Sequence, residues 1–230
     1  MKRQLTFLLA LVCGFFVLFS CGADKQSSTS ENQTQIEESD TSEKPDLTPV
    51  PQTGDIIFHH SMGSQSKAIE NATNFEYTHC GIVVVKNKSI LVFEAGNPVQ
   101  LNTMEEFVER GKDKKFVIKR LKNAHHLFTP AQDDRMQLVA KDYVGKKYDI
   151  HFQWSDDEIY CSELVWKIFK RALNIELCPL NTIKTFDLSS AEAQRLIKAR
   201  FPKGINENEL AVSPRDIFQS DLLVTVPMGQ

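Results

Sequence analysis

Cys161 is the residue of this 230-residue sequence whose surroundings best suit side-chain chemistry. It follows an acidic turn and precedes segment 162–173, whose apolar residues recur at helical spacing on one face. The partial positive charge of a helix N-terminus stabilises a thiolate, which is the nucleophilic form of cysteine. Because a cysteine is more often a small buried packing residue, a nucleophilic role for Cys161 requires a base within reach.

The candidate base is His79, the second residue of a predicted strand over 78–86. Side chains alternate along a strand, so His79 and Gly81 share one face. A two-residue turn at 87–88 would pair position 81 with position 94, which puts Glu94 diagonal to His79 on the same face. An odd-length loop would send Glu94 to the other face. The even register therefore predicts that Glu94 orients the His79 ring.

These three side chains are suited to nucleophilic catalysis. His79 would deprotonate the Cys161 thiol, Glu94 would hold the ring, and main-chain N–H groups near residue 161 would stabilise an oxyanion. The attack would give an acyl thioester that water then resolves.

Three neighbours of Cys161 are weaker candidates for substrate contact. Tyr160 either packs in the core or helps to line the oxyanion site. Asp156 and Asp157 either form a solvated turn or receive a substrate ammonium group, although acidic groups would oppose formation of a thiolate. The sequence favours the solvated turn.

No metal site or cofactor is predicted. The histidine pairs at 59–60 and 125–126 have no further ligand at helical spacing, so we expect solvated loop histidines. Cys80 and Cys178 form no CxxC motif, and we expect both to be buried packing residues.

Residues 1–20 have the pattern of a signal peptide. Two basic residues precede an apolar run over 5–19. That run is shorter than the roughly 20 residues that span a bilayer, so a permanent transmembrane helix is the less favoured alternative. The run ends like a bacterial lipobox, which predicts cleavage before Cys21 and its acylation. Several acyl chains would then anchor the protein stably.

Residues 21–50 are predicted to be a tether. They contain few aliphatic and no aromatic residues, so they cannot bury a core. Seven acids against two lysines give the segment a net charge of −5, and random-coil scaling gives a span of about 30 Å. We expect a protein of the bacterial cell envelope, anchored by Cys21 and facing the periplasm or the exterior.

Residues 51–230 are predicted to form one domain. It contains 23 acidic and 23 basic residues, so nothing favours nucleic acid as a partner. The order of elements predicts an α+β fold in which helices pack against an antiparallel sheet. The predicted strands are 55–58, 78–86, 89–94, 115–121 and 222–226, and the predicted helices are 64–72, 102–110, 130–144, 162–173 and 189–200.

An ordered set of motifs over about residues 52–222 resembles the permuted papain-like amidases of the YiiX/YaeF type, within the NlpC-like cysteine hydrolase superfamily. The resemblance implies a circularly permuted papain-like fold in which the histidine precedes the cysteine. It also implies catalytic roles for His79, Glu94 and Cys161. The segments that carry it are 54–58, 65–69, 77–82, 93–95, 154–157 and 159–166, with weaker support from 186–188 and 213–214.

The preferred function is hydrolysis of an amide bond, in a cell-wall peptide given the exported location. One alternative is a lipid amide or ester hydrolase, or an acyltransferase. Another is a binding module that has lost turnover, against which the presence of all three catalytic residue types argues. A long apolar groove at the thiol would favour a lipid substrate, and a short polar cleft with acidic residues would favour a peptide.

Overall fold

The computed structural model describes residues 49–228. The predicted signal peptide, Cys21 and nearly all of the predicted tether lie outside the described residues, so these assignments stay predictions. No helix within residues 49–228 combines the length and apolar character needed to cross a membrane.

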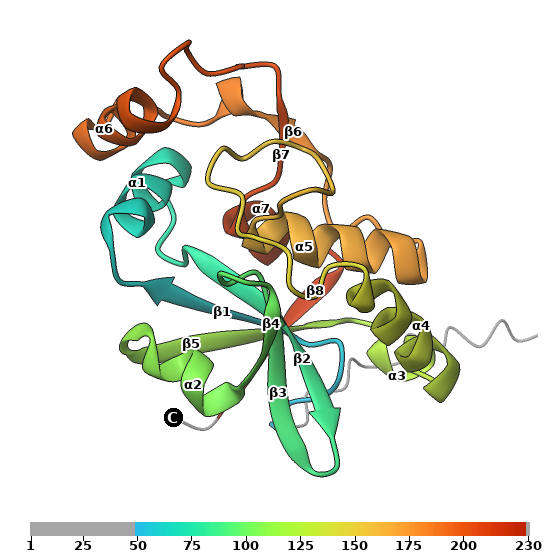
Figure 1. Ribbon diagram of the computed structural model, residues 1–230. Helices are drawn as coiled ribbons and strands as arrows, with labels where there is room; N and C mark the ends of the chain where they lie inside the picture. The colour runs from blue at the N-terminus through green and yellow to red at the C-terminus, as the bar shows by residue number, and fades with distance from the viewer. Residues whose placement is uncertain (1–48, 229–230) are drawn as a thin grey trace, which may run out of the picture. The chain divides into compact units, whose positions relative to one another are not determined.

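A six-stranded antiparallel sheet forms the centre of the domain, with strand order β4-β3-β2-β1-β5-β8 (Figure 1). A short pair, β6 with β7, lies outside it. The predicted α+β class with an antiparallel sheet is confirmed. The strands are β1 (Ile56–Ser61), β2 (His79–Lys86), β3 (Ser89–Glu94), β4 (Gln100–Thr103), β5 (Gly111–Leu121), β6 (Asn181–Thr182), β7 (Leu210–Ala211) and β8 (Leu223–Val226).

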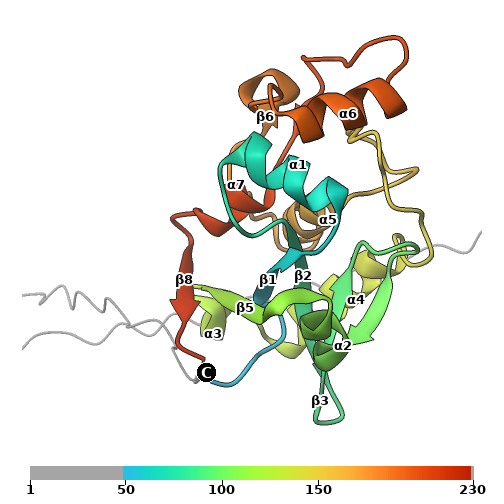
Figure 2. The ribbon, with the colours of Figure 1, turned by 90° about the vertical axis from the view of Figure 1, so that its left-hand side faces the viewer.

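The helices cover both faces of this sheet. Helix α5 packs on β2, α2 packs on β5, and α1 lies beside α6 (Figures 1 and 2). The helices are α1 (Ser64–Thr73), α2 (Met104–Glu109), α3 (Ala124–Leu127), α4 (Pro130–Lys141), α5 (Cys161–Ile168), α6 (Ala191–Arg200) and α7 (Pro214–Phe218), with a π turn at Phe169–Leu173 and a 3-10 turn at Ile183–Thr185.

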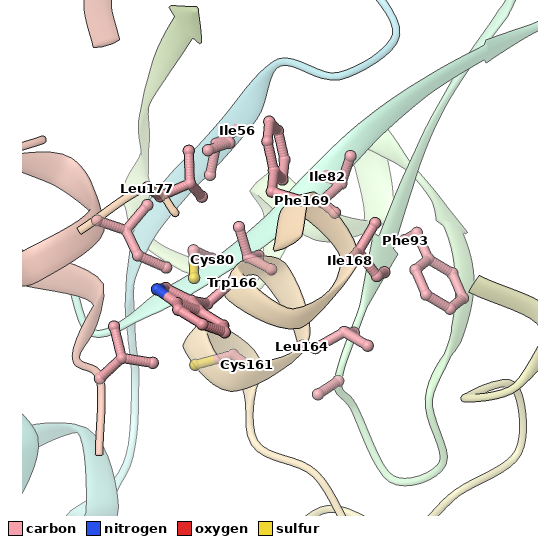
Figure 3. Close-up of a cluster of buried hydrophobic side chains, with 14 of the residues drawn as sticks. Ile56, Cys80, Ile82, Phe93, Cys161, Leu164, Trp166, Ile168, Phe169 and Leu177 are labelled. Atoms are coloured by element: carbon pink, nitrogen blue, oxygen red, sulfur yellow. The ribbon is translucent and has the colours of Figure 1, made fainter. Parts of the chain in front are cut away.

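The alternation of strand residues divides the core in two. Cys80 and Ile82 of β2 point into the larger cluster, which includes α5 (Figure 3). Val83, on the other face, packs with Phe107 of α2. His79 belongs to the Phe107 side, since its ring centroid lies 5.6 Å from that of Phe107.

The β2–β3 hairpin has the predicted register. Asn87 and Lys88 both adopt left-handed backbone conformations, with φ of 51° and 66°, as a two-residue type I′ turn requires. Ile82 pairs with Phe93, and this register places Gly81 opposite Glu94. A Cβ at Gly81 would lie 2.6 Å from Val92 Cγ1 and 3.2 Å from Glu94 Cβ. A side chain at position 81 would therefore displace Val92 and crowd Glu94.

The sequence pattern missed five short elements. β4, β6, β7, α3 and α7 have two to five residues each, and a hydrophobic period is seldom recognisable over so few residues. The predicted helix 162–173 begins one residue earlier and changes to a π turn at Phe169.

A buried ion pair joins the start of the domain to the sheet. Arg120 of β5 donates to Asp55 from Nε at 2.7 Å and from Nη2 at 2.8 Å. Both side chains are 1% exposed. Removing one partner would leave the other charge buried without compensation.

We expect Arg120→Met to lower the free energy of unfolding by about 3–5 kcal/mol, since it breaks a buried pair. Lys67→Met is the matched control, because Lys67 pairs with Glu70 at the surface and such pairs contribute less than about 1 kcal/mol. Urea unfolding of both variants measures the difference. Equal losses would contradict the importance assigned to the buried pair.

Candidate active site

Cys161 is the first residue of α5, so it lies at the helix N-terminus as predicted. Tyr160 caps the helix in an extended conformation, and the chain turns into the helix directly at the cysteine. The side chain belongs to a buried cluster to which β2 contributes Cys80 (Figure 3). A helix N-terminus with unpaired N–H groups therefore adjoins the sulfur.

His79 and Glu94 form the predicted contact. His79 Nε2 lies 2.6 Å from Glu94 Oε2, and the Glu94 side chain is fully buried. The other carboxylate oxygen accepts a hydrogen bond from Asn102 Nδ2 at 2.7 Å and another from Arg110 Nη2. Because Nε2 faces the carboxylate, Nδ1 is the ring nitrogen left for the thiol.

His79 and Glu94 each stabilise the charged form of the other. Burial alone would raise the pKa of Glu94, but His79 and Arg110 outweigh it and lower that pKa to about 2. Burial alone would lower the pKa of His79, whereas hydrogen bonding to Cys161 and to Glu94 raises it to about 9. At neutral pH the ring is a cation beside a carboxylate.

The thiol of Cys161 loses its proton easily in this setting. Hydrogen bonding from Cys80 is the largest influence that holds the pKa of Cys161 well below its usual range, and His79 acts in the same direction against burial. Burial raises the pKa of Cys80, so Cys80 stays a thiol that can donate. The site can therefore hold a thiolate–imidazolium pair at neutral pH.

Sequence reasoning missed several residues that complete the site. Asn102 and Arg110 lie next to opposite ends of α2, and no motif marks their contact with Glu94. Burial and the neighbouring Cys161 raise the pKa of the Tyr148 hydroxyl, which accepts a hydrogen bond from Gln65 at 3.2 Å. Only the folding of distant segments onto one another brings these groups together.

The prediction of solvated loop histidines is wrong for His59. It lies in β1, is 1% exposed, and has its ring centroid 5.2 Å from that of His79. Burial and the neighbouring His79 lower its pKa to about 3. His59 is therefore a neutral wall of the site.

The other predicted candidates lie as follows. The Tyr160 hydroxyl accepts a hydrogen bond from Val212 N at 3.2 Å, so this ring packs in the core, and its oxyanion role stays a prediction. Asp156 pairs with Lys167 and Arg171, both at 2.8 Å. Asp157 is exposed. Neither aspartate lines the cavities that adjoin Cys161 and His79.

Two cavities meet at the reactive groups. One, of about 130 Å³, is lined by Cys161 and is largely apolar. The other, of about 500 Å³, is lined by His79 and has both polar and apolar walls. Gln65, Ile69 and Tyr148 line both. A substrate bond lying beside these shared residues would be within reach of the thiol and the imidazole.

Comparisons with known proteins identify related chains. The family model of the permuted papain-like amidases, the YaeF/YiiX or C92 family, matches residues 50–227. The protein YiiX of Escherichia coli strain K12 is 42% identical over 176 residues, which are 76% of this chain and 86% of that protein. The crystal structure of the metalloprotein YiiX from Escherichia coli O157:H7 has a TM-score of 0.73 and 41% identity, over 78% of this chain and 98% of that one.

A metal is not needed to explain the acidic residues before α5. Within the described part of the chain, one group of three side chains brings possible ligand atoms within 4.8 Å of one another: Asp149, His151 and Glu158. The Asp149 oxygens already accept the main-chain N–H groups of His151 and Gln153, at 2.7 and 2.6 Å. These bonds account for the buried carboxylate, and the chemistry proposed below uses no metal.

We expect alkylation of Cys161 by iodoacetamide to change little between pH 6 and pH 8. An ordinary cysteine, with a pKa near 8.5, would react about a hundredfold faster at the higher pH. The raised pKa of His79 means that its charge is complete below pH 6.5 and is lost as the pH rises through about 9. Mass spectrometry of the peptide containing Cys161 measures the rate, with the Cys178 peptide as internal control.

Cys178 should react slowly throughout, because burial raises its pKa to about 12. A rate at Cys161 that rises tenfold per pH unit from 6 to 8 would show an ordinary thiol and would contradict the ion pair.

Proposed function

The chain belongs to the permuted papain-like amidase family and is a cysteine hydrolase, and we propose that it cleaves an amide bond through Cys161, His79 and Glu94. The observation that carries this proposal is the fully buried Glu94 held 2.6 Å from the His79 ring, which in turn interacts with Cys161.

The first half of the reaction forms an acyl-enzyme. The Cys161 thiolate attacks the amide carbon, and the His79 imidazolium gives its proton to the nitrogen as the carbon–nitrogen bond breaks. The free amine leaves and the acyl group stays on sulfur as a thioester. Glu94 stabilises the imidazolium before this transfer and keeps the ring in place after it.

The second half releases the acid. His79, now neutral, takes a proton from water, and the resulting hydroxide attacks the thioester carbon. The carbon–sulfur bond breaks, the carboxylic acid leaves, and the thiolate–imidazolium pair forms again. Each proton taken up by His79 is thus returned within the cycle.

Two kinds of donor are suited to the oxyanion of both steps. The main-chain N–H of Cys161 stands at the N-terminus of α5. The Tyr148 hydroxyl accepts a hydrogen bond from Gln65 and neighbours Cys161, so it is placed to donate its proton to an oxyanion that forms there. Donors fixed before the reaction are the ones that stabilise developing charge most.

We expect Glu94→Gln to lower turnover by roughly 10-fold to 1,000-fold while the fold is kept, because the amide retains a hydrogen bond but no charge. Cys161→Ala should abolish formation of the thioester. Glu109→Gln is the matched control, since Glu109 pairs with Lys114 at the surface. Turnover and trapped acyl-enzyme are measured by mass spectrometry with murein peptides and lipid amides as substrates. Unchanged turnover of Glu94→Gln across pH would refute the role of Glu94.

We also propose that the mature protein begins at Cys21 and is acylated there, which would hold the enzyme on a membrane of the bacterial cell envelope. The supporting pattern is the charged start, the apolar run and the cysteine that follows it. The acyl chains would bind the protein to that membrane. The domain has no net charge, so nothing favours nucleic acid as a partner.

Metabolic labelling with a fatty-acid analogue should tag the wild-type protein and should not tag Cys21→Ala. Cys178→Ala is the control and should be tagged like the wild type. Labelling that persists in Cys21→Ala would contradict the lipoprotein assignment.

A further inference from the structure

The cavity that adjoins Cys161 is almost wholly apolar. It lies between α1, α6 and the segment 183–188, and α6 runs beside α1 (Figures 1 and 2). Apart from the Cys161 thiolate, Arg200 is the one charged side chain among the described residues that line it. Its apolar wall includes Ile69, Ala72, Phe186, Leu196, Ile197 and Phe201.

The cavity that adjoins His79 has a mixed lining, with a larger polar share than the first cavity, although Met62 and Ile150 also line it. Ser61, Ser64 and Asn97 line it together with Arg110. Glu94 also lines it, but its two oxygens are held by His79, Asn102 and Arg110. This cavity therefore offers hydroxyl, amide and guanidinium groups to a ligand.

The reaction decides which half of a substrate enters which cavity. The acyl group stays bonded to Cys161, whereas the amine receives its proton from His79 and departs. The acyl half must therefore lie on the cysteine side and the amine half on the histidine side. The cysteine side is the apolar cavity, and the histidine side is the cavity that offers more polar groups.

We propose that the substrate is an N-acyl amide whose acyl part is an unbranched aliphatic chain held in the apolar cavity, and whose amine part is polar. This inference rests on the proposed function. A peptide on the acyl side would bury amide N–H and C=O groups against apolar walls, and each unpaired group costs free energy. An aliphatic chain meets no such cost, and its burial is favourable.

The size of the apolar cavity sets the useful chain length. At about 130 Å³ it resembles a cavity of about 150 Å³ that holds a benzene ring. It therefore encloses about six carbon atoms. Chains lengthened from two to eight carbons should show the effect of burial most clearly.

The test uses the full chain and a series of N-acylglycines with acyl groups of two, four, six and eight carbons. Mass spectrometry of released glycine gives kcat/KM for each. Each added methylene should raise kcat/KM about fourfold while the chain stays enclosed. Murein peptides are assayed in parallel, and Cys161→Ala provides the background for both.

Two matched variants locate the effect. Leu196→Asn places an amide of nearly the same size in the apolar wall. The ratio of kcat/KM for the eight-carbon substrate to kcat/KM for the two-carbon substrate should therefore be at least tenfold smaller than in the wild type. Leu138→Asn makes the same change on α4, where Leu138 is 65% exposed, and should leave the series as it is in the wild type. Equal series in both variants would overturn the proposed location.

Binding separates failure of this inference from failure of the proposed function. Calorimetry with octanoate and the Cys161→Ala protein should show binding that Leu196→Asn weakens. If octanoate binds but no substrate is cleaved, the proposed binding site for the aliphatic chain stands and the hydrolase proposal fails. If murein peptides are cleaved through Cys161 while the acylglycine series is flat, the inference is overturned and the hydrolase proposal stands. If nothing binds and nothing is cleaved, both are wrong.

Discussion

The hydrogen bond between Glu94 and His79 is the interaction on which the site depends. A buried carboxylate is costly unless its oxygens are satisfied, and here His79, Asn102 and Arg110 all contact Glu94. The fixed negative charge favours the imidazolium, and the imidazolium favours the thiolate. Each charge of the site is thus stabilised by the next.

The fold supplies this arrangement through the register of one hairpin. A shift of one residue between β2 and β3 would turn Glu94 to the other face of the sheet. The left-handed turn at Asn87 and Lys88 fixes the register. Gly81 gives the carboxylate room. The buried ion pair of Asp55 and Arg120 then ties the segment before β1 to β5.

Local pattern was sufficient to predict the hairpin, its register and the helix that begins at Cys161. Strand alternation decides which residues of a hairpin share a face once the turn length is known, so the sequence predicted the contact of His79 with Glu94 for an even-length turn, and the structure has that turn. The ordered motifs added the family. Gln65, Tyr148 and Arg110 were missed, because their contacts join segments far apart in the chain and no local period encodes them. The burial of His59 was missed because β1 extends three residues beyond its predicted end at Phe58.

The position of the reactive pair between two unlike cavities connects the chemistry with the choice of substrate. In the proposed reaction, the Cys161 thiolate attacks the amide carbon and the His79 imidazolium protonates the nitrogen. The reaction therefore divides an amide into an acyl half beside the sulfur and an amine half beside the imidazole. In the proposed substrate, the apolar wall near Cys161 would hold the acyl half, and the polar groups in the mixed wall near His79 would contact the amine half. The sequence-based preference for a cell-wall peptide rested on the exported location alone. The apolar wall of the Cys161 cavity could not be predicted in that way, because it forms only when α1 and α6 come together in the fold.

The protonation state of His79 tests the central claim most directly. Nitrogen-15 chemical shifts of its ring, followed from pH 5 to pH 10, give its pKa in the folded protein. The account predicts a value near 9 and a fall in Cys161→Ala, because the interaction with the thiolate is lost. A pKa below 6.5 in the wild-type protein, unchanged in Cys161→Ala, would contradict it.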